Sequence, residues 1–320
     1  NYNVVVGDEA GTAITTGDNN VAVGYQSLDA NTTGSRLTAV GNEALSANTT
    51  AAFNVAVGDR ALLTNTGSAN NVAVGANALY TFNVGSGDGY NVAVGKNAGL
   101  SVTTGHTNTL IGGLAGDAIT TGSGNTFIGF ESGSYGTNLT TGTTNTLVGA
   151  YNNTTAVNSV NAMGLGYNLD CAGGYTTVGS GSAEIRAPHG SAAWATASDQ
   201  RYKKDIVDST AGLSFINALQ PRTFKYKTLG ELPETFSAYE ADSTEVFKNS
   251  ETNHGFIAQE VKAAIDADAS IKDGFRLWDD REDGSQEVAE AALIPVLVKA
   301  IQEQNALITA LTARVAELEG

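Results

Sequence analysis

The sequence predicts a mostly β fold. A β-solenoid built from coils of about 17 residues should be followed by an α+β domain that ends in a coiled-coil helix. Three observations lead to this prediction. A short Asn-x-x-x-Gly segment recurs through the first half of the chain. The composition changes abruptly near Ser198. Apolar residues recur with heptad spacing close to the C-terminus.

The recurring segment sets the size of one coil. It has eight complete copies and a ninth, Leu37–Gly41, that lacks the Asn. Successive copies end on glycines that lie 17 or 20 residues apart, which is too short for a strand, a helix and two loops. We therefore expect each coil to hold two short strands and two turns, and to pair with the next coil. The complete copies begin at Asn3, Asn20, Asn54, Asn71, Asn91, Asn108, Asn125 and Asn145.

Two positions of the segment predict specific contacts between coils. The Asn side chains fall at the same position in successive coils, where they can form a ladder along the solenoid. The repeated Gly predicts a corner at which φ is positive or two backbones approach closely.

The middle of the segment has two apolar faces, because successive strand residues point to opposite sides. Val21 and Val23 share one face, and Ala22 lies on the other. The alanine position stays small for five coils and is then occupied by Leu or Phe. We expect the bulky face to line the interior of each coil. We expect the small face to pack against another subunit, with a roomier interface after Gly112.

The segment Asn-Val-Ala-Val-Gly, as at Asn54–Gly58, resembles the Asn-x-Val-Ala-Ile-Gly repeat of trimeric autotransporter heads. The resemblance covers roughly residues 1–150. It implies a left-handed β-roll that trimerises. The repeat of this chain is longer than the usual repeat of that family, which leaves the handedness of the solenoid open.

The chain divides by composition close to Ser198. Residues 1–197 hold 15 charged residues and 32 of the 38 glycines, whereas residues 198–320 hold 35 charged residues. Such a change indicates two kinds of structure. We expect solenoid repeats in residues 1–180, a linker in 181–197, a mixed domain in 198–290 and a coiled-coil helix in 291–320.

Composition argues against several functions. The net charge of −16 repels phosphate backbones, so we expect no nucleic-acid partner. The apolar runs are too short to cross a bilayer and no basic amphipathic segment is present, so we expect no membrane insertion. Cys171 is the single cysteine and no His, Asp or Glu cluster has metal-ligand spacing, so we expect no metal and no cofactor. A single thiol favours assembly in a reducing cytoplasm. Because the chain begins at Asn1 without Met, we expect the C-terminal part of a longer protein.

Three stretches beyond the boundary carry a second resemblance. The stretches are Ser-Asp-x-x-x-Lys-x-x-Ile at Ser198–Ile206, then Leu213–Tyr226, then His254–Val261 followed by Leu293–Gln304. Their order and spacing resemble the C-terminal intramolecular chaperones of phage tail fibres and tailspikes, the endosialidase-type family. Members of that family trimerise a fibrous protein and then cut themselves off.

This resemblance implies a self-cleavage site made by a Ser-Lys dyad. The bond that is cut is Ala197–Ser198, with Ser198 as the nucleophile and Lys203 as the base. A hydroxyl needs a nearby base to attack an amide. A lysine can act as that base only after it has lost its proton, which burial and the like charges of Arg201 and Lys204 would favour. The supporting residues of the motif are Asp199, Arg201, Ile206, His254 and Gln259.

The spacing of Ser198 and Lys203 leaves alternatives open. On a straight strand an odd spacing puts the two side chains on opposite faces, so the segment must bend or a neighbouring subunit must complete the site. The nitrogen of Ser198 is part of the bond that is cut, so an N-to-O acyl shift followed by ester hydrolysis is one route. The plainer interpretation is that Ser198 and Asp199 cap a turn and that Lys203 is a solvated lysine.

The C-terminal segment predicts one long helix from Ala291 with heptad spacing. Ile at the a positions with Leu at the d positions favours a dimer, whereas the polar Gln304 and the family resemblance favour three strands, and we expect three. The a positions are Ile294, Ile301, Ile308 and Val315, and the d positions are Leu297, Gln304, Leu311 and Leu318.

Together these features predict a trimeric viral tail-fibre or tailspike segment with a self-cleaving trimerisation chaperone. Its partners would be further copies of itself and a host-surface receptor or glycan. It would be assembled in the host bacterial cytoplasm and reside in the virion. The alternatives are a bacterial trimeric surface adhesin and a tailspike that degrades a polysaccharide. Residues 1–197 hold only eleven carboxylates and no convincing acid pair, which counts against the second alternative.

Overall fold

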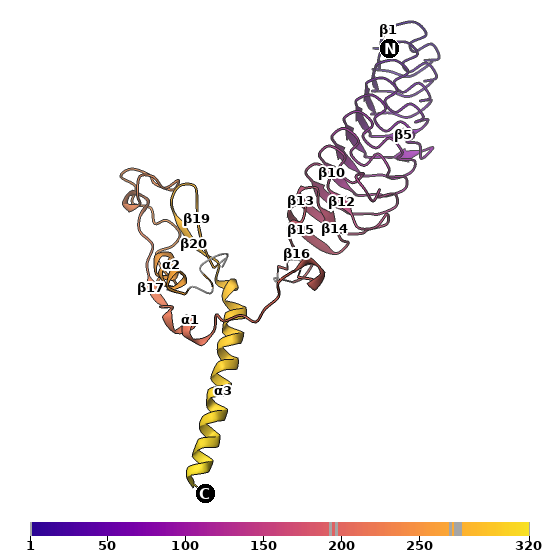
Figure 1. Cartoon of the computed structure of the whole chain (residues 1–320). Helices are drawn as coiled ribbons and strands as arrows, with labels where there is room; N and C mark the ends of the chain where they lie inside the picture. The colour runs from indigo at the N-terminus through magenta and orange to yellow at the C-terminus, as the bar shows by residue number, and fades with distance from the viewer. Residues whose placement is uncertain (1, 192–193, 196–197, 269–270, 272–276, 320) are drawn as a thin grey trace. The chain divides into compact units, whose positions relative to one another are not determined.

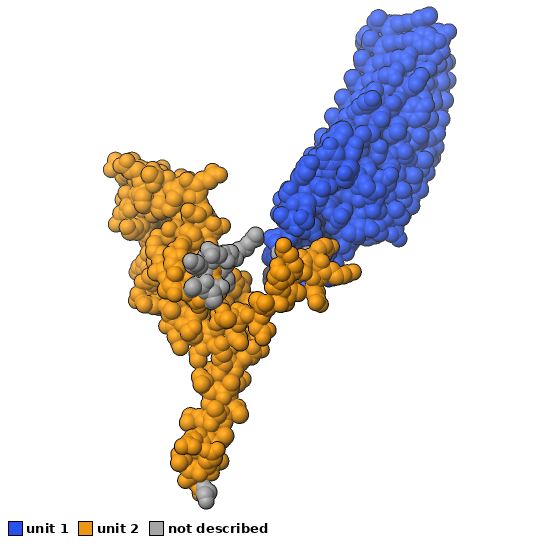
Figure 2. Space-filling model, viewed as in Figure 1, with its two compact units in different colours: residues 1–199 blue, residues 200–320 orange. Residues whose placement is uncertain are grey.

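The computed structural model describes the chain apart from residues 1, 192–193, 196–197, 269–270, 272–276 and 320. The chain divides into two compact units, Asn1–Asp199 and Gln200–Gly320, which Figure 2 shows in different colours.

The first unit is the predicted β-solenoid (Figure 1). Its coils stack so that one short strand from each joins a 12-stranded sheet, and the strands up to β15 pair in parallel. The pairing is in register: Val21 lies opposite Thr38, and Ala22 opposite Ala39. The strands of this sheet are β1 (Val4–Val6), β2 (Val21–Val23), β3 (Thr38–Val40), β4 (Val55–Val57), β6 (Val72–Val74), β8 (Val92–Val94), β9 (Thr109–Ile111), β10 (Thr126–Ile128), β11 (Thr146–Val148), β13 (Met163–Tyr167), β15 (Tyr175–Ser180) and β16 (Ala183–Pro188).

The prediction of two strands per coil is wrong for most coils. On the side opposite the sheet, regular pairing occurs only between β5 (Ser68–Ala69) and β7 (Gly87–Asp88), and between β12 (Asn153–Thr154) and β14 (Asp170–Cys171), within the described residues. The remaining coils turn there on non-glycine residues in the left-handed region. In the second coil these are Gln26, Leu28 and Arg36, with φ of 52°, 52° and 58°.

The repeated Gly of the segment behaves as predicted. At Gly112 φ is +136°, and a Cβ added there would lie 2.3 Å from the carbonyl oxygen of Gly129 in the next coil. Both reasons for glycine therefore apply at once, because the backbone conformation and the close approach each exclude a side chain.

The Asn side chains form the predicted ladder, and those from Asn20 to Asn145 are fully buried inside the solenoid. Asn108 shows the pattern: its Nδ2 donates to the carbonyl of Gly122 at 2.9 Å, and its Oδ1 accepts the N–H of Asn125 at 3.0 Å. The N–H of Asn108 itself donates to Oδ1 of Asn91 at 3.0 Å. Each amide thus satisfies backbone groups that the corner leaves without partners.

The prediction for the two faces of the strands is wrong. Ala22 and Phe127, at corresponding positions of their coils, are both fully buried, so the small face lines the interior. Val21 and Val23 are half-buried on the outer surface of the sheet. The cause lies opposite the sheet, where buried leucines such as Leu45 already fill the narrow interior of the early coils.

The later coils exchange large and small residues across this interior. Where Leu110 and Phe127 replace the alanines, the opposite position becomes glycine. A Cβ on Gly116 would lie 2.7 Å from Cδ2 of Leu110, and one on Gly133 would lie 2.2 Å from the Phe127 ring. The volume of the interior therefore stays the same, but in the later coils the large side chains come from the sheet and not from the side opposite it.

The last strand closes the sheet. β16 runs antiparallel to β15, unlike every strand before it in the 12-stranded sheet. On its other edge Arg186 and Ala195 exchange two backbone hydrogen bonds of 2.9 and 2.8 Å. β16 lies within residues 181–197, which we expected to form the linker. Cys171 is fully buried nearby, and this burial raises the pKa of its thiol to about 12.

The second unit combines helices with short strand pairs, as the predicted α+β domain requires. Its core is formed by Phe215, Val261, Ile265, Leu277 and Val296 with their neighbours. The predicted C-terminal helix begins at Leu293, and its C-terminal half projects away from the rest of this unit (Figure 1). The elements are η1 (Gln200–Tyr202), α1 (Leu213–Ala218), β17 (Arg222–Phe224), η2 (Leu229–Glu231), β18 (Asn253–Gly255), α2 (Ala258–Ala267), β19 (Trp278–Asp280), β20 (Gln286–Val288), η3 (Glu290–Ala292) and α3 (Leu293–Glu319).

Replacing Asn108 by Ala should destabilise the solenoid more than replacing an exposed Asn. The change leaves the buried N–H of Asn125 and carbonyl of Gly122 without these partners, at a cost of about 1–3 kcal/mol for each group. Chemical denaturation followed by circular dichroism would measure the loss, with the exposed Asn158→Ala as the control. Equal stability of the two variants would contradict a structural role for the ladder.

Candidate cleavage site and its domain

The predicted dyad lies on either side of the division between the units. Ser198 and Asp199 end the first unit, and Lys203 lies near the start of the second. Between them the backbone is not an extended strand, because η1 turns it and the N–H of Lys203 donates to the carbonyl of Gln200 at 3.0 Å. Ala197 lies outside the described residues. The pairing of Ser198 with Lys203 stays a prediction.

The side chains of the motif face water in the single chain. Ser198, Asp199, Arg201 and Lys203 are all exposed. Burial is one of the conditions that let a lysine act as a base. The single chain therefore does not provide the burial that the dyad chemistry requires.

The other predicted site residues lie on different elements. Ile206 is largely exposed in the segment before α1. His254 is exposed on β18, where it pairs with Thr223 of β17. Gln259 is exposed in the first turn of α2. Their roles in cleavage stay predictions.

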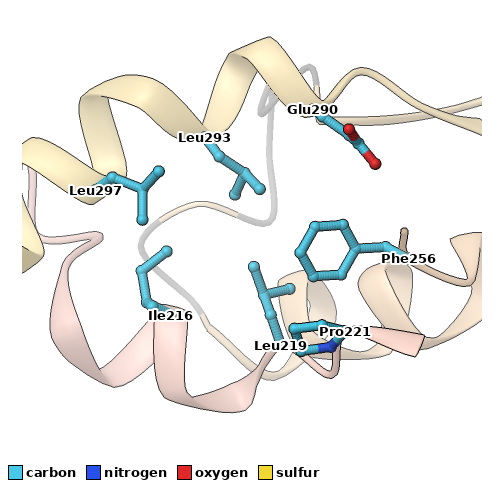
Figure 3. Close-up of a pocket in the computed structure, with 7 residues that line it drawn as sticks. All are labelled: Ile216, Leu219, Pro221, Phe256, Glu290, Leu293 and Leu297. Carbon is cyan, nitrogen blue, oxygen red and sulfur yellow. The ribbon is translucent and has the colours of Figure 1, made fainter. Parts of the chain in front are cut away.

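The other motif stretches meet at one apolar pocket in the second unit (Figure 3). Its volume is about 380 Å³, and Leu219, Phe256 and Leu293 represent the three stretches in its wall. Glu290 contributes the single carboxylate. The remaining lining residues are Ile216, Pro221 and Leu297.

Two of the stretches are also joined by an ion pair. Arg222 on β17 donates from Nε to Oε2 of Glu260 at 2.9 Å and from Nη2 to Oε1 at 2.7 Å. The guanidinium holds the pKa of Glu260 below its usual value, chiefly through these hydrogen bonds. The two-pronged geometry fixes the start of α2 against β17.

A carboxylate from α3 caps α1. The residue at the N-cap of α1 is Gly212, which has no side chain to accept a hydrogen bond. Glu303 takes over this role, because its Oε2 accepts the N–H of Leu213 at 2.8 Å. The contact holds the wall of the pocket to the long helix, and it was not predicted from the sequence.

One carboxylate between β19 and β20 has a structural role. Asp283 accepts hydrogen bonds from the N–H and the hydroxyl of Ser237, each at 3.0 Å. It also accepts from the N–H and the hydroxyl of Ser285, at 2.9 and 2.6 Å. These bonds, the backbone one from Ser237 first, hold the pKa of Asp283 well below its usual range. The carboxylate therefore ties the segment after η2 to the β19–β20 hairpin.

The described residues contain no group of three His, Cys, Asp or Glu side chains placed to hold a metal ion. Within the same residues no helix combines the length and apolar character needed to span a membrane.

Comparison with known proteins identifies the same region. Residues 198–269 match the model of a peptidase family described as chaperone of endosialidase. No curated protein and no solved structure matches the chain. The matched region and the β-solenoid before it fit a tail-fibre-like protein with an endosialidase-type chaperone domain.

Replacing Glu303 by Ala should destabilise the second unit by about 1 kcal/mol, the usual worth of a helix N-cap. Chemical denaturation followed by Trp278 fluorescence would measure the loss in a Trp194→Phe background. Glu317→Ala is the matched control, because Glu317 lies on the same helix and pairs only with exposed Arg314 in the described part of the chain. An equal loss in both variants would show that the Glu303 contact is not a cap.

Proposed function

We propose that this chain is a segment of a trimeric viral tail fibre or tailspike whose C-terminal region trimerises it and then cleaves the Ala197–Ser198 bond. The observation that carries the proposal is the family match, which begins at Ser198. A solenoid lies before this residue and a domain with an exposed helix lies after it. That order is the one a removable assembly domain requires.

The proposed chemistry uses Ser198 as the nucleophile and Lys203 as the base. Lys203 takes the hydroxyl proton while Oγ attacks the carbonyl carbon of Ala197. The C–N bond then breaks, the nitrogen of Ser198 gains a proton, and Ala197 is held as an ester on Oγ. Water hydrolyses this ester. The products are residues 1–197 with a new carboxylate and residues 198–320 with a new amino terminus.

Exposure of the motif supports cleavage that waits for assembly. Ser198 and Lys203 are both exposed in the single chain. A neighbouring copy that covers this segment would remove water from Lys203 and favour its neutral form. Cleavage before assembly would separate the solenoid from the domain that trimerises it. If cleavage requires a neighbouring copy, trimerisation always comes first.

The long helix α3 supports self-association. Its two faces differ: Leu293, Val296 and Ala300 are buried against the rest of the unit, whereas the apolar a and d positions face water. Leu311 is 65% exposed, although leucine is usually buried. A stripe with this spacing is covered when helices associate as a coiled coil. The exposed members are Ile294, Leu297, Ile301, Ile308, Leu311, Val315 and Leu318.

The outer face of the 12-stranded sheet supports association along the fibre. In each of the eight strands from β2 to β11 in this sheet, the two residues that flank the buried central one are Val, Ile or Thr. At a strand spacing of roughly 4.8 Å, this uncharged strip is on the order of 35 Å long. Parallel sheets are normally covered on both faces, and further copies of the chain would provide the cover.

A host-surface receptor or glycan is the proposed target of the fibre, with the virion as its site. An adhesin of the bacterial surface is the first alternative, and the match to a chaperone of endosialidase at residues 198–269 favours the fibre. A polysaccharide-degrading tailspike is the second alternative, and it needs a pair of carboxylates with distinct roles in the solenoid.

Wild-type protein should appear on a denaturing gel as two pieces, and Ser198→Ala and Lys203→Ala should each remain whole. Without the nucleophile or the base, the first step has no route. N-terminal sequencing of the small piece should give Ser-Asp-Gln-Arg-Tyr. The exposed Ser250→Ala and Lys227→Ala serve as matched controls that should still cut. A cut at another bond, or cleavage that persists in Ser198→Ala or Lys203→Ala, would contradict the dyad.

Replacing Ile301, Ile308 and Leu311 together by Gln should abolish both trimerisation and cleavage, because the heptad stripe loses its apolar contacts. Light scattering after gel filtration gives the oligomeric state, and a denaturing gel gives the cut. The control replaces Ala306, Thr309 and Ala313 by Gln, since these lie outside the a and d positions. Efficient cutting in a verified monomer would show that one chain holds the complete site.

A further inference from the structure

Four aromatic side chains gather on the surface of the solenoid near its C-terminal end. The ring of Tyr151 is at their centre, and the rings of Phe130, Tyr135 and Tyr167 meet it with centroid distances of 5.6, 5.0 and 5.6 Å. All three contacts are edge-to-face, with interplanar angles of 76°, 68° and 84°. We call these four residues the aromatic cluster. It combines residues from three successive coils, so the stacking of the coils assembles it.

The chain departs from its own repeat to form the cluster. The coil from Gly129 to Gly149 is three residues longer than the usual 17, and Tyr135 lies in the loop that carries the extra length. Tyr151 adopts φ +58°, a left-handed conformation that recurs at the equivalent residue of other coils, for example Glu43, Asn77 and Asn97. At this repeated corner the longer loop places Tyr135 against Tyr151, with the ring centroids 5.0 Å apart. Loops that depart from a regular scaffold often carry binding residues.

The cluster does not belong to the core. Phe130, Tyr135 and Tyr167 are 44, 47 and 53% exposed. Within the described residues the hydroxyls of Tyr135, Tyr151 and Tyr167 make no hydrogen bond. The same corner in other coils carries residues as different as Asn42, Ala76 and Tyr25. The fold therefore does not require an aromatic ring at this corner.

The chemistry of the cluster restricts its ligand. Exposed aromatic faces with open hydroxyls at their edges suit a molecule that has flat C–H surfaces and its own hydroxyls. Sugars and nucleobases both stack on such rings. No Lys or Arg occurs between Lys96 and Arg186, whereas carboxylates do, so a phosphate backbone or an anionic glycan finds no cation here. The exposed amides of Asn138 and Asn168 lie in the same loops as Tyr135 and Tyr167.

We infer that the aromatic cluster is a binding platform for a neutral glycan. The inference deepens the proposed function and rests on it for its biological meaning, because it assigns the receptor contact of the fibre to Tyr135, Tyr151 and their neighbours. Glycan binding itself depends on neither cleavage nor the Ser-Lys dyad. A failed binding test and a failed cleavage test therefore overturn different claims.

The test is affinity electrophoresis of the full chain in native gels that contain a neutral glucan, mannan or galactan. We expect at least one of these polymers to retard the wild-type protein. Tyr151→Asn combined with Tyr135→Ala should weaken the binding about tenfold or more, because stacking on a ring contributes on the order of 1–3 kcal/mol. Asn is the natural residue at this position in other coils, so the variant keeps a backbone conformation that it suits.

The matched control is Tyr25→Ala combined with Tyr90→Ala, which removes two exposed tyrosines from other coils and should leave the binding unchanged. Three outcomes would overturn the inference. None of the three polymers retards the wild-type protein. The control loses binding as fully as the cluster variant does. The cluster variant loses its oligomeric state in light scattering, in which case the rings are a contact between copies of the chain.

Discussion

Most coils of the solenoid depend on a buried asparagine amide that bonds to the backbone of the next coil. The amide of Asn108 accepts a backbone N–H from one coil and donates to a carbonyl of the same coil, while its own N–H reaches back to Asn91. Buried backbone groups must find partners, and the corners of a narrow coil offer none in the regular sheet pattern. The spacing of the asparagines therefore sets the length of the repeat, and extra residues are accepted only in loops, as around Tyr135.

The same regularity creates the difficulty that an assembly domain would solve. The sheet presents nearly the same Val, Ile and Thr pair at every coil, so two copies shifted by one coil would meet with almost the same fit. The ladder cannot correct this shift, because it acts only within a chain. A domain that is not repetitive, such as residues 200–320, can define one register. The proposed cleavage then removes that domain after the register has been set.

The features of the repeat that follow from a requirement of the backbone were predictable, whereas features that depend on contacts between distant residues were not. The ladder of Asn side chains and the tight corner at Gly could be predicted from the spacing of these residues. Both meet a requirement of the backbone that recurs along the solenoid. The prediction of which strand face lines the interior was wrong because it considered Val21 and Ala22 alone. It did not include the leucines on the opposite side of the coil, which leave room only for a small residue. The exchange between Phe127 and Gly133 was visible in the sequence, and it would have identified the interior.

In the second unit, spacing predicted α3 because heptads are local. Glu303 caps α1 from a position 90 residues further along the chain, and no periodic pattern in the sequence predicts this contact. No local pattern indicates that Asp283 accepts four hydrogen bonds, because two of them come from Ser237, which lies 46 positions away. The site residues Ser198 and Lys203 came from a family resemblance, so their chemistry remains a prediction.

The antiparallel closing strand has a consequence for how these molecules meet end to end. A stack of parallel strands has a direction, and its last strand leaves one edge with which another stack could pair. Here the last parallel strand is β15. Head-to-tail addition at such an edge would extend the sheet from one molecule to the next, as in a growing filament. β16 occupies this edge in the opposite direction, and its bonds with Ala195 cover part of what it would itself expose. This arrangement disfavours head-to-tail addition at the C-terminal end of the sheet.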